Sequence, residues 1–184
     1  MQVTDRITAD EYLAFEGERR TWLVDGTIVV NEPRLPHAVL SMRLIRGLDD
    51  WTRAADDRGF LTIPIDVQLD EHNVYAPDLL WYQPGRAPAF DADPPYPLPD
   101  LAIEIRSSST WRYDIGTKKR VYEAQGLPEL WLVDGDAGVL LVFRRSTRSG
   151  ATFDVELEFD RSATITSPLL PGFMLDAGAL FDFG

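Results

Sequence analysis

The order of apolar and polar residues predicts two helices in the N-terminal part of the chain. Between residues 37 and 55, apolar side chains recur at three- and four-residue spacing, which is typical of an amphipathic helix with one buried face. These side chains are Leu40, Leu44, Ile45, Leu48 and Trp51. Near the N-terminus, Thr8 precedes Glu11 by the spacing of a capping box, so we expect a short helix over residues 7–16.

Runs of apolar and β-branched residues predict the strands. An Asp-Gly pair divides residues 21–30 into two apolar halves, which indicates a β-hairpin. Two longer strands are expected over 60–69 and 73–82. The near-continuous apolar character of LAIEI at 101–105 indicates a central strand that is buried on both faces. Another strand, ELWLVD, follows at 129–134, and shorter ones follow it. The pattern predicts a single α/β domain over residues 1–184, with a mixed central sheet flanked by helices and additional strands at both ends.

Composition narrows the possible chemistry. Apolar residues make up 45% of the chain and charged residues 26%, as in ordinary globular proteins. There are no cysteines, which excludes disulfides, thiolate zinc sites and cysteine nucleophiles, and there are only two histidines. A bound metal should therefore be a hard cation held by carboxylates. No apolar stretch has the length of a membrane span, and the N-terminus does not resemble a signal peptide, so we expect a cytoplasmic protein with no membrane partner.

The formal net charge of -12 disfavours a basic nucleic-acid-binding surface. A local basic groove is still compatible with this total if certain cationic residues gather on one side. The candidates are Arg19, Arg20, Arg43, Arg46, Arg106, Arg112, Lys118, Lys119 and Arg120.

Two acids and a lysine stand out as candidates for chemistry. Asp78 follows Pro77 at the end of an expected strand, and Glu104 interrupts the apolar strand LAIEI. Burying a lone carboxylate costs roughly several kcal/mol of desolvation free energy unless a cation or strong hydrogen-bond donors compensate it. Two carboxylates on neighbouring strands suit Mg²⁺, with Mn²⁺ as a substitute, and the backbone carbonyl of Ile105 is a third possible ligand. Such a cation would polarise a phosphodiester, and Lys118 could orient the attacking water and offset charge.

The helix expected from about 114 to 125 favours Lys118 over its neighbour. At about 100° per residue, Lys118 lies in the middle of the stripe that must face the sheet, whereas Lys119 lies at its edge. These two residues are the only lysines among 18 basic residues. Arginine cannot deprotonate or act as a compact point charge, so a lysine here is compatible with a specific role. Each of the three residues also has an ordinary structural explanation: a turn for Asp78, an isolated polar residue for Glu104, a partly covered side chain for Lys118.

Three segments together resemble the Uma two family of restriction endonucleases, within the PD-(D/E)xK nuclease superfamily. They are PD at 77–78, EIRSSST at 104–110 and DIGTKKRVYEAQGLPELWLVD at 114–134. LVDGTIVV, PHAVLSMRL and SPLLPGFMLDAGALF are similar to the family's N-terminal hairpin, first core helix and C-terminal end.

The resemblance implies a restriction-endonuclease-like fold in a bacterial protein, a divalent-metal site, cleavage of DNA and a homodimer. It makes Asp78, Glu104 and Lys118 the catalytic set, with the metal held by Asp78, Glu104 and Ile105. Arg106 stands where the superfamily has its usual lysine, two residues after the glutamate, and is a candidate for binding phosphate. His37 and Tyr122 are further candidates for contact with substrate.

One departure supports an alternative function. The family often has a glutamate directly before LVDG, where this chain has Trp22. With Arg106 and the acidic charge, Trp22 is compatible with a nuclease-fold module that is weakly active or inactive and serves in nucleic-acid or protein binding. A metal-dependent hydrolase with another substrate is the third possibility.

Overall fold

In the computed structural model, the described residues are 6–15, 21–30, 33–107 and 113–184, with the side chains of residues 113 and 114 excepted. Among them, no helix combines the length and the apolar character that crossing a membrane requires.

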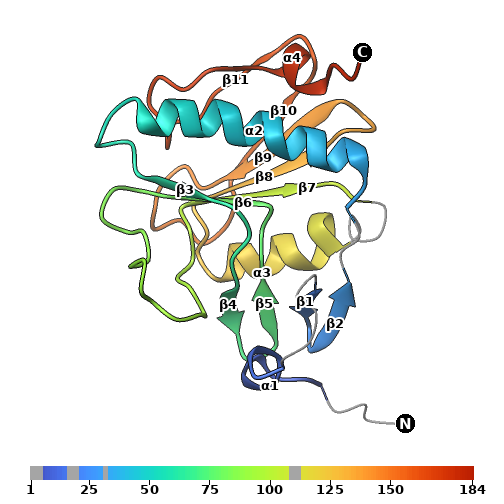
Figure 1. The fold of residues 1–184 in the computed structure, drawn as a ribbon, viewed down its shortest axis with the longest axis vertical. Helices are drawn as coiled ribbons and strands as arrows, with labels where there is room; N and C mark the ends of the chain where they lie inside the picture. Colours follow the sequence, from blue (N-terminus) through green and yellow to red (C-terminus); the bar gives the residue numbers. More distant parts are fainter. Residues whose placement is uncertain (1–5, 16–20, 31–32, 108–112) are drawn as a thin grey trace.

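A six-stranded mixed sheet forms the centre of the molecule (Figure 1). Its order is β10-β9-β8-β7-β6-β3, and its only parallel neighbours are β7 and β8. The strands are β3 (Phe60–Thr62), β6 (Leu79–Tyr82), β7 (Leu101–Ile105), β8 (Glu129–Asp134), β9 (Val139–Arg144) and β10 (Val155–Phe159). Because β7 and β8 are parallel, the chain between them must cross over the sheet, and it does so through a helix. This crossover carries Lys118 and Tyr122 over the strand that contains Glu104.

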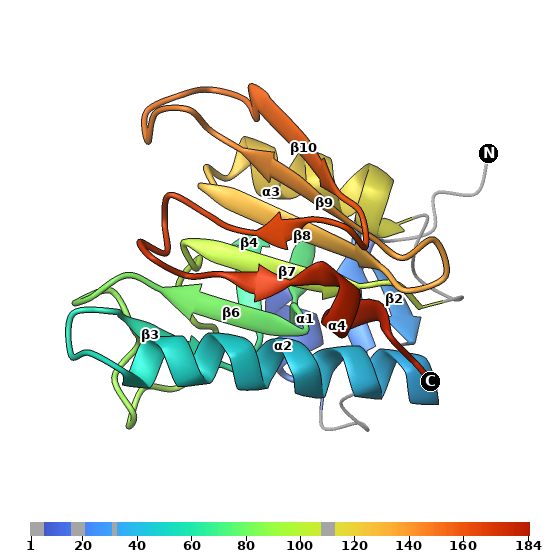
Figure 2. The ribbon, with the colours of Figure 1, turned by 90° about the horizontal axis from the view of Figure 1, so that it is seen from above.

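One face of the sheet is covered by α2 (Leu35–Arg53) and the C-terminal segment (Figures 1 and 2). The predicted stripe forms the contact, since Leu40, Leu44 and Leu48 are at most 1% exposed. The C-terminal segment adds β11 (Thr164–Ile165), β12 (Leu175–Asp176) and α4 (Ala177–Phe181). The helix begins two residues earlier than predicted. Pro36 lies in its first turn, where a missing N–H removes no hydrogen bond.

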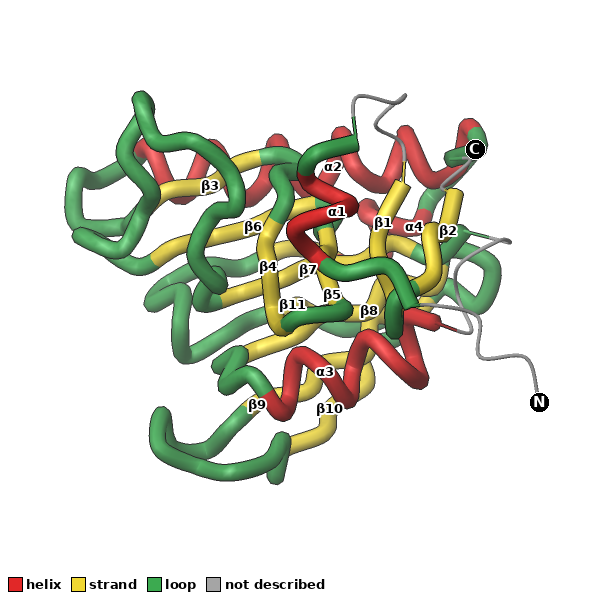
Figure 3. Tube along the Cα trace, turned by 90° about the horizontal axis from the view of Figure 1, so that it is seen from below, coloured by secondary structure: helices red, strands yellow, loops and turns green. Residues whose placement is uncertain are grey.

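The opposite face is covered by the crossover helix and a four-stranded sheet (Figure 3). The crossover comprises a π-helical turn, η1 (Tyr113–Lys118), followed by α3 (Lys119–Ala124). The small sheet has the order β2-β1-β5-β4 and consists of β1 (Thr21–Val24), β2 (Thr27–Val30), β4 (Val67–Asp70) and β5 (Asn73–Tyr75). With both faces covered, every residue of β7 is buried, as predicted.

The two long strands predicted at 60–69 and 73–82 are wrong in extent. Each is divided into a pair of short strands, and each pair contributes one strand to each sheet. The breaks fall at Pro64 and Pro77, which have no N–H to donate to a sheet and restrict the residue before them. Asp78 therefore directly precedes β6 instead of ending a strand.

The predicted N-terminal elements are present. Helix α1 (Ala9–Leu13) has the full capping box between Thr8 and Glu11, and β1 and β2 form the hairpin around Asp25-Gly26. Asp25 and Gly26 both have positive φ (49° and 73°), as a tight hairpin turn requires. Residues 83–99 form a long loop, here called the proline-rich loop.

The packing of α2 on the sheet leads to the first prediction. Leu44→Ala, at a side chain that is fully buried, should lower the free energy of unfolding by about 2–5 kcal/mol, because it removes apolar contacts and leaves a cavity. Met42→Ala on the same helix, at a side chain that is 71% exposed, is the matched control and should cost less than about 0.5 kcal/mol. Urea unfolding of the two variants measures both values. Equal effects would contradict this orientation of α2.

Candidate functional site

The two predicted acids lie at the same end of two neighbouring strands, Asp78 directly before β6 and Glu104 on β7. In the antiparallel pairing of β6 with β7, Leu79 lies opposite Ile103, so the next position sets Asp78 opposite Glu104. Directly opposed residues of an antiparallel pair project to the same side of a sheet. Asp78 and Glu104 are therefore adjacent, although 26 residues separate them in the sequence.

Asp78 is held by two donors. Its Oδ2 accepts a hydrogen bond from the backbone N–H of Ile105 at 2.7 Å, and its Oδ1 lies 3.1 Å from Nε2 of His37 on α2. The carboxylate is thus fixed between the end of β7 and the start of α2. Asp78 and His37 are each 8% exposed, so both are close to solvent without being open to it.

Glu104 has a separate set of partners on the crossover helix. Its Oε1 accepts hydrogen bonds from Nζ of Lys118 at 3.1 Å and from the hydroxyl of Tyr122 at 2.9 Å. Lys118 and Tyr122 are fully buried, and Glu104 is 1% exposed. Burial strengthens the attraction between the two charges and makes either of them costly without the other.

Aromatic rings complete the surroundings of Lys118. Nζ lies 3.4 Å from the centre of the Trp22 ring on β1 and 5.5 Å from that of Tyr75 on β5. A cation over an aromatic face is stabilised by the ring quadrupole, and more so where water is excluded. Tyr75 in turn packs edge-on against Tyr122, with ring centres 5.3 Å apart. Burial raises the pKa of Tyr75 well above its ordinary value, and nearby acids, Glu104 among them, add to the effect.

The predicted positions of the two lysines on the helix are confirmed, because Lys118 is fully buried and Lys119 is partly exposed. Lys119 lies at the edge of the helix, where Nζ contacts Glu156 at 3.0 Å and the Phe143 ring at 3.7 Å. Ile115, three residues before Lys118, would share its face in a regular α-helix but is 45% exposed. The reason is the π-helical turn, whose wider spacing shifts the residues before Lys118 out of the α-helical stripe.

The three substrate-binding candidates have different surroundings. Arg106 Nη1 donates to both carboxylate oxygens of Asp134, at 2.9 and 2.7 Å, which the sequence did not suggest. Tyr122 is buried behind Glu104, so it contacts the acid rather than the molecular surface. Of the three, only His37 lines the cavity next to Asp78.

A cavity of about 920 Å³ opens beside Asp78, His37 and Trp22. Its other walls come from α2, from the segment after β3 and from the proline-rich loop. These walls are largely apolar, and the residues that form them are Thr21, Pro33, Ala38, Ser41, Met42, Ile45, Ile63, Pro64, Ile65, Asp66, Ala76, Pro94 and Tyr96.

The local basic groove that the sequence left open does not line this cavity in the described part of the chain, since no arginine or lysine belongs to its walls. Lys118 is buried and Arg106 is bound to Asp134. Arg19, Arg20 and Arg112 lie outside the described residues.

The residues near Asp78 and Glu104 are compatible with a Mg²⁺ site of the kind in which the protein supplies only one or two carboxylate ligands. Within the described ranges, no three histidine, aspartate or glutamate side chains form a metal-binding group. Mg²⁺ commonly takes one or two carboxylates and completes its octahedral shell with water and substrate oxygens. Asp78 and Glu104 fit this requirement in the chemistry of their side chains.

The mixed sheet and the helices that cover it define an α/β protein, and the two acids and the buried lysine make its candidate site. Residues 9–178 match the model of the Uma2 family, described as "Putative restriction endonuclease", and the chain belongs to this family. A crystal structure described as a "putative nuclease" from Anabaena variabilis ATCC 29413 has the same fold, with a TM-score of 0.79 at 18% identity, covering 95% of this chain and 97% of that one. No curated protein matches the sequence. Family and fold together support a nuclease function.

The buried pair leads to the second prediction. Lys118→Met should lower the free energy of unfolding by about 3–5 kcal/mol, because it leaves the Glu104 carboxylate buried without its cation. Lys119→Met is the matched control and should cost less than about 1 kcal/mol, since it removes an ion pair and a cation–ring contact near the surface. Chemical denaturation measures both.

A double variant separates charge from shape. Combining Glu104→Gln with Lys118→Met removes both charges and should recover part of the stability that Lys118→Met loses. If the double variant were no more stable than Lys118→Met alone, the cost would lie in packing rather than in an uncompensated carboxylate.

Proposed function

We propose that this protein is a divalent-metal-dependent endonuclease that hydrolyses phosphodiester bonds in DNA. The observation that carries the proposal is the facing arrangement of Asp78 and Glu104 across β6 and β7. Lys118 lies within hydrogen-bonding distance of Glu104, and a large cavity adjoins Asp78. Membership of a restriction-endonuclease family supports the same reaction class.

The carboxylates of Asp78 and Glu104, with the backbone carbonyl of Ile105, are the groups that would hold Mg²⁺ or Mn²⁺. Such a cation polarises a phosphodiester and stabilises the charge that develops during hydrolysis. The protein's own contribution is to fix the acids before substrate arrives. The N–H of Ile105 and the imidazole of His37 orient Asp78, and Lys118 and Tyr122 orient Glu104.

Lys118 acts on Glu104 in this scheme. It is fully buried and its Nζ is covered by the Trp22 ring, so the direct contact that the geometry supports is with the carboxylate. Its ammonium charge compensates the acid at a position buried from solvent. Direct steering of water by Lys118 and phosphate binding by Arg106 stay predictions, as do the homodimer and the cytoplasmic location.

Asp78→Asn and Glu104→Gln should each lower the cleavage rate by about a hundredfold or more, because each removes a charge on which the reaction depends. Lys118→Met should also lower it, by disturbing Glu104. The measurement is nicking of supercoiled DNA and degradation of single-stranded DNA with Mg²⁺ or Mn²⁺, with added EDTA as the metal-free control.

Lys119→Met and Asp49→Asn are the controls, since Lys119 contacts Glu156 and Asp49 lies on the exposed side of α2. Both should cleave at the wild-type rate. Activity that persisted undiminished in Glu104→Gln would point to a contaminating nuclease and remove the assignment. A wild-type protein that binds DNA without cleaving it would favour the alternative of an inactive binding module.

The walls of the cavity also bear on the form of the substrate. Duplex DNA presents two charged backbones and is bound mainly through cations, whereas an unpaired strand also offers base faces to apolar and aromatic side chains. The cavity has apolar and aromatic side chains of this type in its walls, namely Trp22, Tyr96, Met42 and Ile63. We therefore expect cleavage of a single-stranded oligonucleotide to exceed cleavage of the same sequence in duplex form by roughly tenfold, from stacking contributions of about 1–3 kcal/mol per base. Equal rates under the same metal and salt conditions would contradict this preference.

A further inference from the structure

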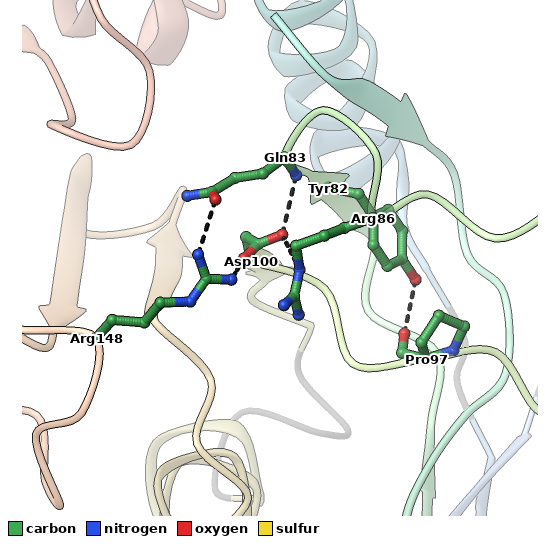
Figure 4. Close-up of polar contacts among 6 residues, drawn as sticks. All are labelled: Tyr82, Gln83, Arg86, Pro97, Asp100 and Arg148. Atoms are coloured by element: carbon green, nitrogen blue, oxygen red, sulfur yellow. Dashed lines mark hydrogen bonds and ion pairs between the residues drawn. The ribbon is translucent and has the colours of Figure 1, made fainter.

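A second polar cluster lies at the opposite end of β7 from Glu104. Asp100 directly precedes β7, about 13 Å along the strand from Glu104 at about 3.3 Å per residue. Its side chain is fully buried, and it accepts from the N–H of Gln83 at 2.9 Å, from Nε of Arg86 at 3.0 Å and from Nη2 of Arg148 at 3.0 Å (Figure 4). Arg148 also donates to the side-chain oxygen of Gln83 at 3.0 Å. These contacts fasten the loop after β9 to both ends of the proline-rich segment.

A cavity of about 350 Å³ adjoins these contacts, and Gln83 and Arg148 are among its lining residues. Among the described residues, no acid belongs to its walls, and three of its lining residues are arginines, although the chain as a whole is acidic. The lining residues are Gln83, Pro128, Arg144, Arg145, Ser146, Arg148, Val155, Pro168 and Leu169.

The three arginines differ in how their donors are used. Arg145 donates to the backbone carbonyls of Leu127, Gly150 and Glu123, so it is a structural residue. Arg148 is bound to Asp100 and Gln83 but is 56% exposed. Arg144 donates no hydrogen bond to any residue in the described part of the chain, and the oxygen of its nearest carboxylate, Oε2 of Glu129, is 3.8 Å away.

Glu129 compensates Arg144 incompletely. Its carboxylate already accepts hydrogen bonds from Trp131 Nε1 at 2.5 Å and from the Ser167 hydroxyl at 2.9 Å. Burial raises the pKa of Glu129 above its ordinary value, against the opposing effects of these hydrogen bonds and of Arg144. Asp154, the acid beside Ser146, is occupied by the N–H and hydroxyl of that serine. Arg144 therefore presents a guanidinium group with unused donors to a cavity.

We propose that this cavity is a binding site for a phosphate-bearing ligand of the nucleotide class, separate from the proposed nuclease site. The guanidinium groups of Arg144 and Arg148 would bind the phosphate, since the planar fork of arginine matches phosphate oxygens. Pro128, Val155, Pro168 and Leu169 form an apolar wall against which a ring can lie. The volume is within the range of about 300–1,000 Å³ that is typical of small-ligand sites.

The test is calorimetric titration of the full chain with deoxyadenosine monophosphate, inorganic phosphate and deoxyadenosine. EDTA is present throughout, so that no cation at Asp78 and Glu104 contributes. The monophosphate should bind more tightly than inorganic phosphate, and the phosphate-free nucleoside should show no measurable binding. Arg144→Gln should weaken binding of the monophosphate about tenfold or more, because it removes charge-assisted hydrogen bonds. Arg53→Gln, at an arginine on α2 whose side chain is 78% exposed, is the control and should bind as the wild type does.

Arg144→Lys serves if Arg144→Gln does not fold, because it keeps a positive charge beside Glu129. It should still weaken binding, since an ammonium group cannot form the paired bonds of a guanidinium. Equal affinity of the wild type and an Arg144 variant, or equal binding of nucleoside and nucleotide, would overturn the proposal.

Two further measurements separate the sources of the phosphate and the two proposals. The first is competition with deoxyadenosine monophosphate by a short DNA strand, with and without a 5′-phosphate. Competition by the phosphorylated strand alone would assign the site to nucleic-acid ends. Competition by neither strand would assign it to free nucleotides. Glu104→Gln should retain full binding, and Arg144→Gln should retain full cleavage activity, so a failure of this site is distinguishable from a failure of the nuclease assignment.

Discussion

The buried ion pair between Glu104 and Lys118 is the interaction on which this arrangement depends. A carboxylate inside a sheet that is covered on both faces would be costly alone. The parallel pairing of β7 with β8 requires a crossover, and the crossover helix delivers the compensating cation to the acid on the strand that it leaves. The crossover that the parallel pairing requires therefore also places a compensating cation beside the buried acid.

The same interaction explains why the small sheet belongs to the site. Trp22 on β1 and Tyr75 on β5 close the space around the ammonium group. Water is kept from the Glu104–Lys118 pair by elements that are distant in the sequence, while Asp78 remains at the wall of a cavity. The site thus has a dry side, where Glu104 is fixed, and an accessible side, where Asp78 and His37 lie. This asymmetry suits metal-assisted hydrolysis, because one acid can be held rigidly while the other adjoins the space for substrate.

The sequence predicted most elements whose signals are local. The stripe of α2, the hairpin around Asp25-Gly26 and the burial of LAIEI each depend on spacing within one segment. The burial of Lys118 beside a partly exposed edge residue, Lys119, followed from helical geometry in the same way. The division of the strands at Pro64 and Pro77 was missed although its cause is local, because the apolar runs on either side of each proline look continuous.

What the sequence could not supply depends on contacts between distant segments. Trp22 was noted only as a departure from a family pattern, and its place over Lys118 follows from the packing of β1 against the crossover helix. Arg106 was expected to meet phosphate, but Asp134 at the end of the adjacent strand reaches it, because the parallel register brings the ends of β7 and β8 together. Arg106 keeps its positive charge beside the proposed site, but its guanidinium group is already bound by the carboxylate of Asp134. Trp22 holds Lys118 in a similar way, because its ring covers the ammonium group. Both candidate cations, Arg106 and Lys118, are thus engaged by other residues of the fold. Of the proposed site, Asp78 and His37 are the polar groups that face the cavity.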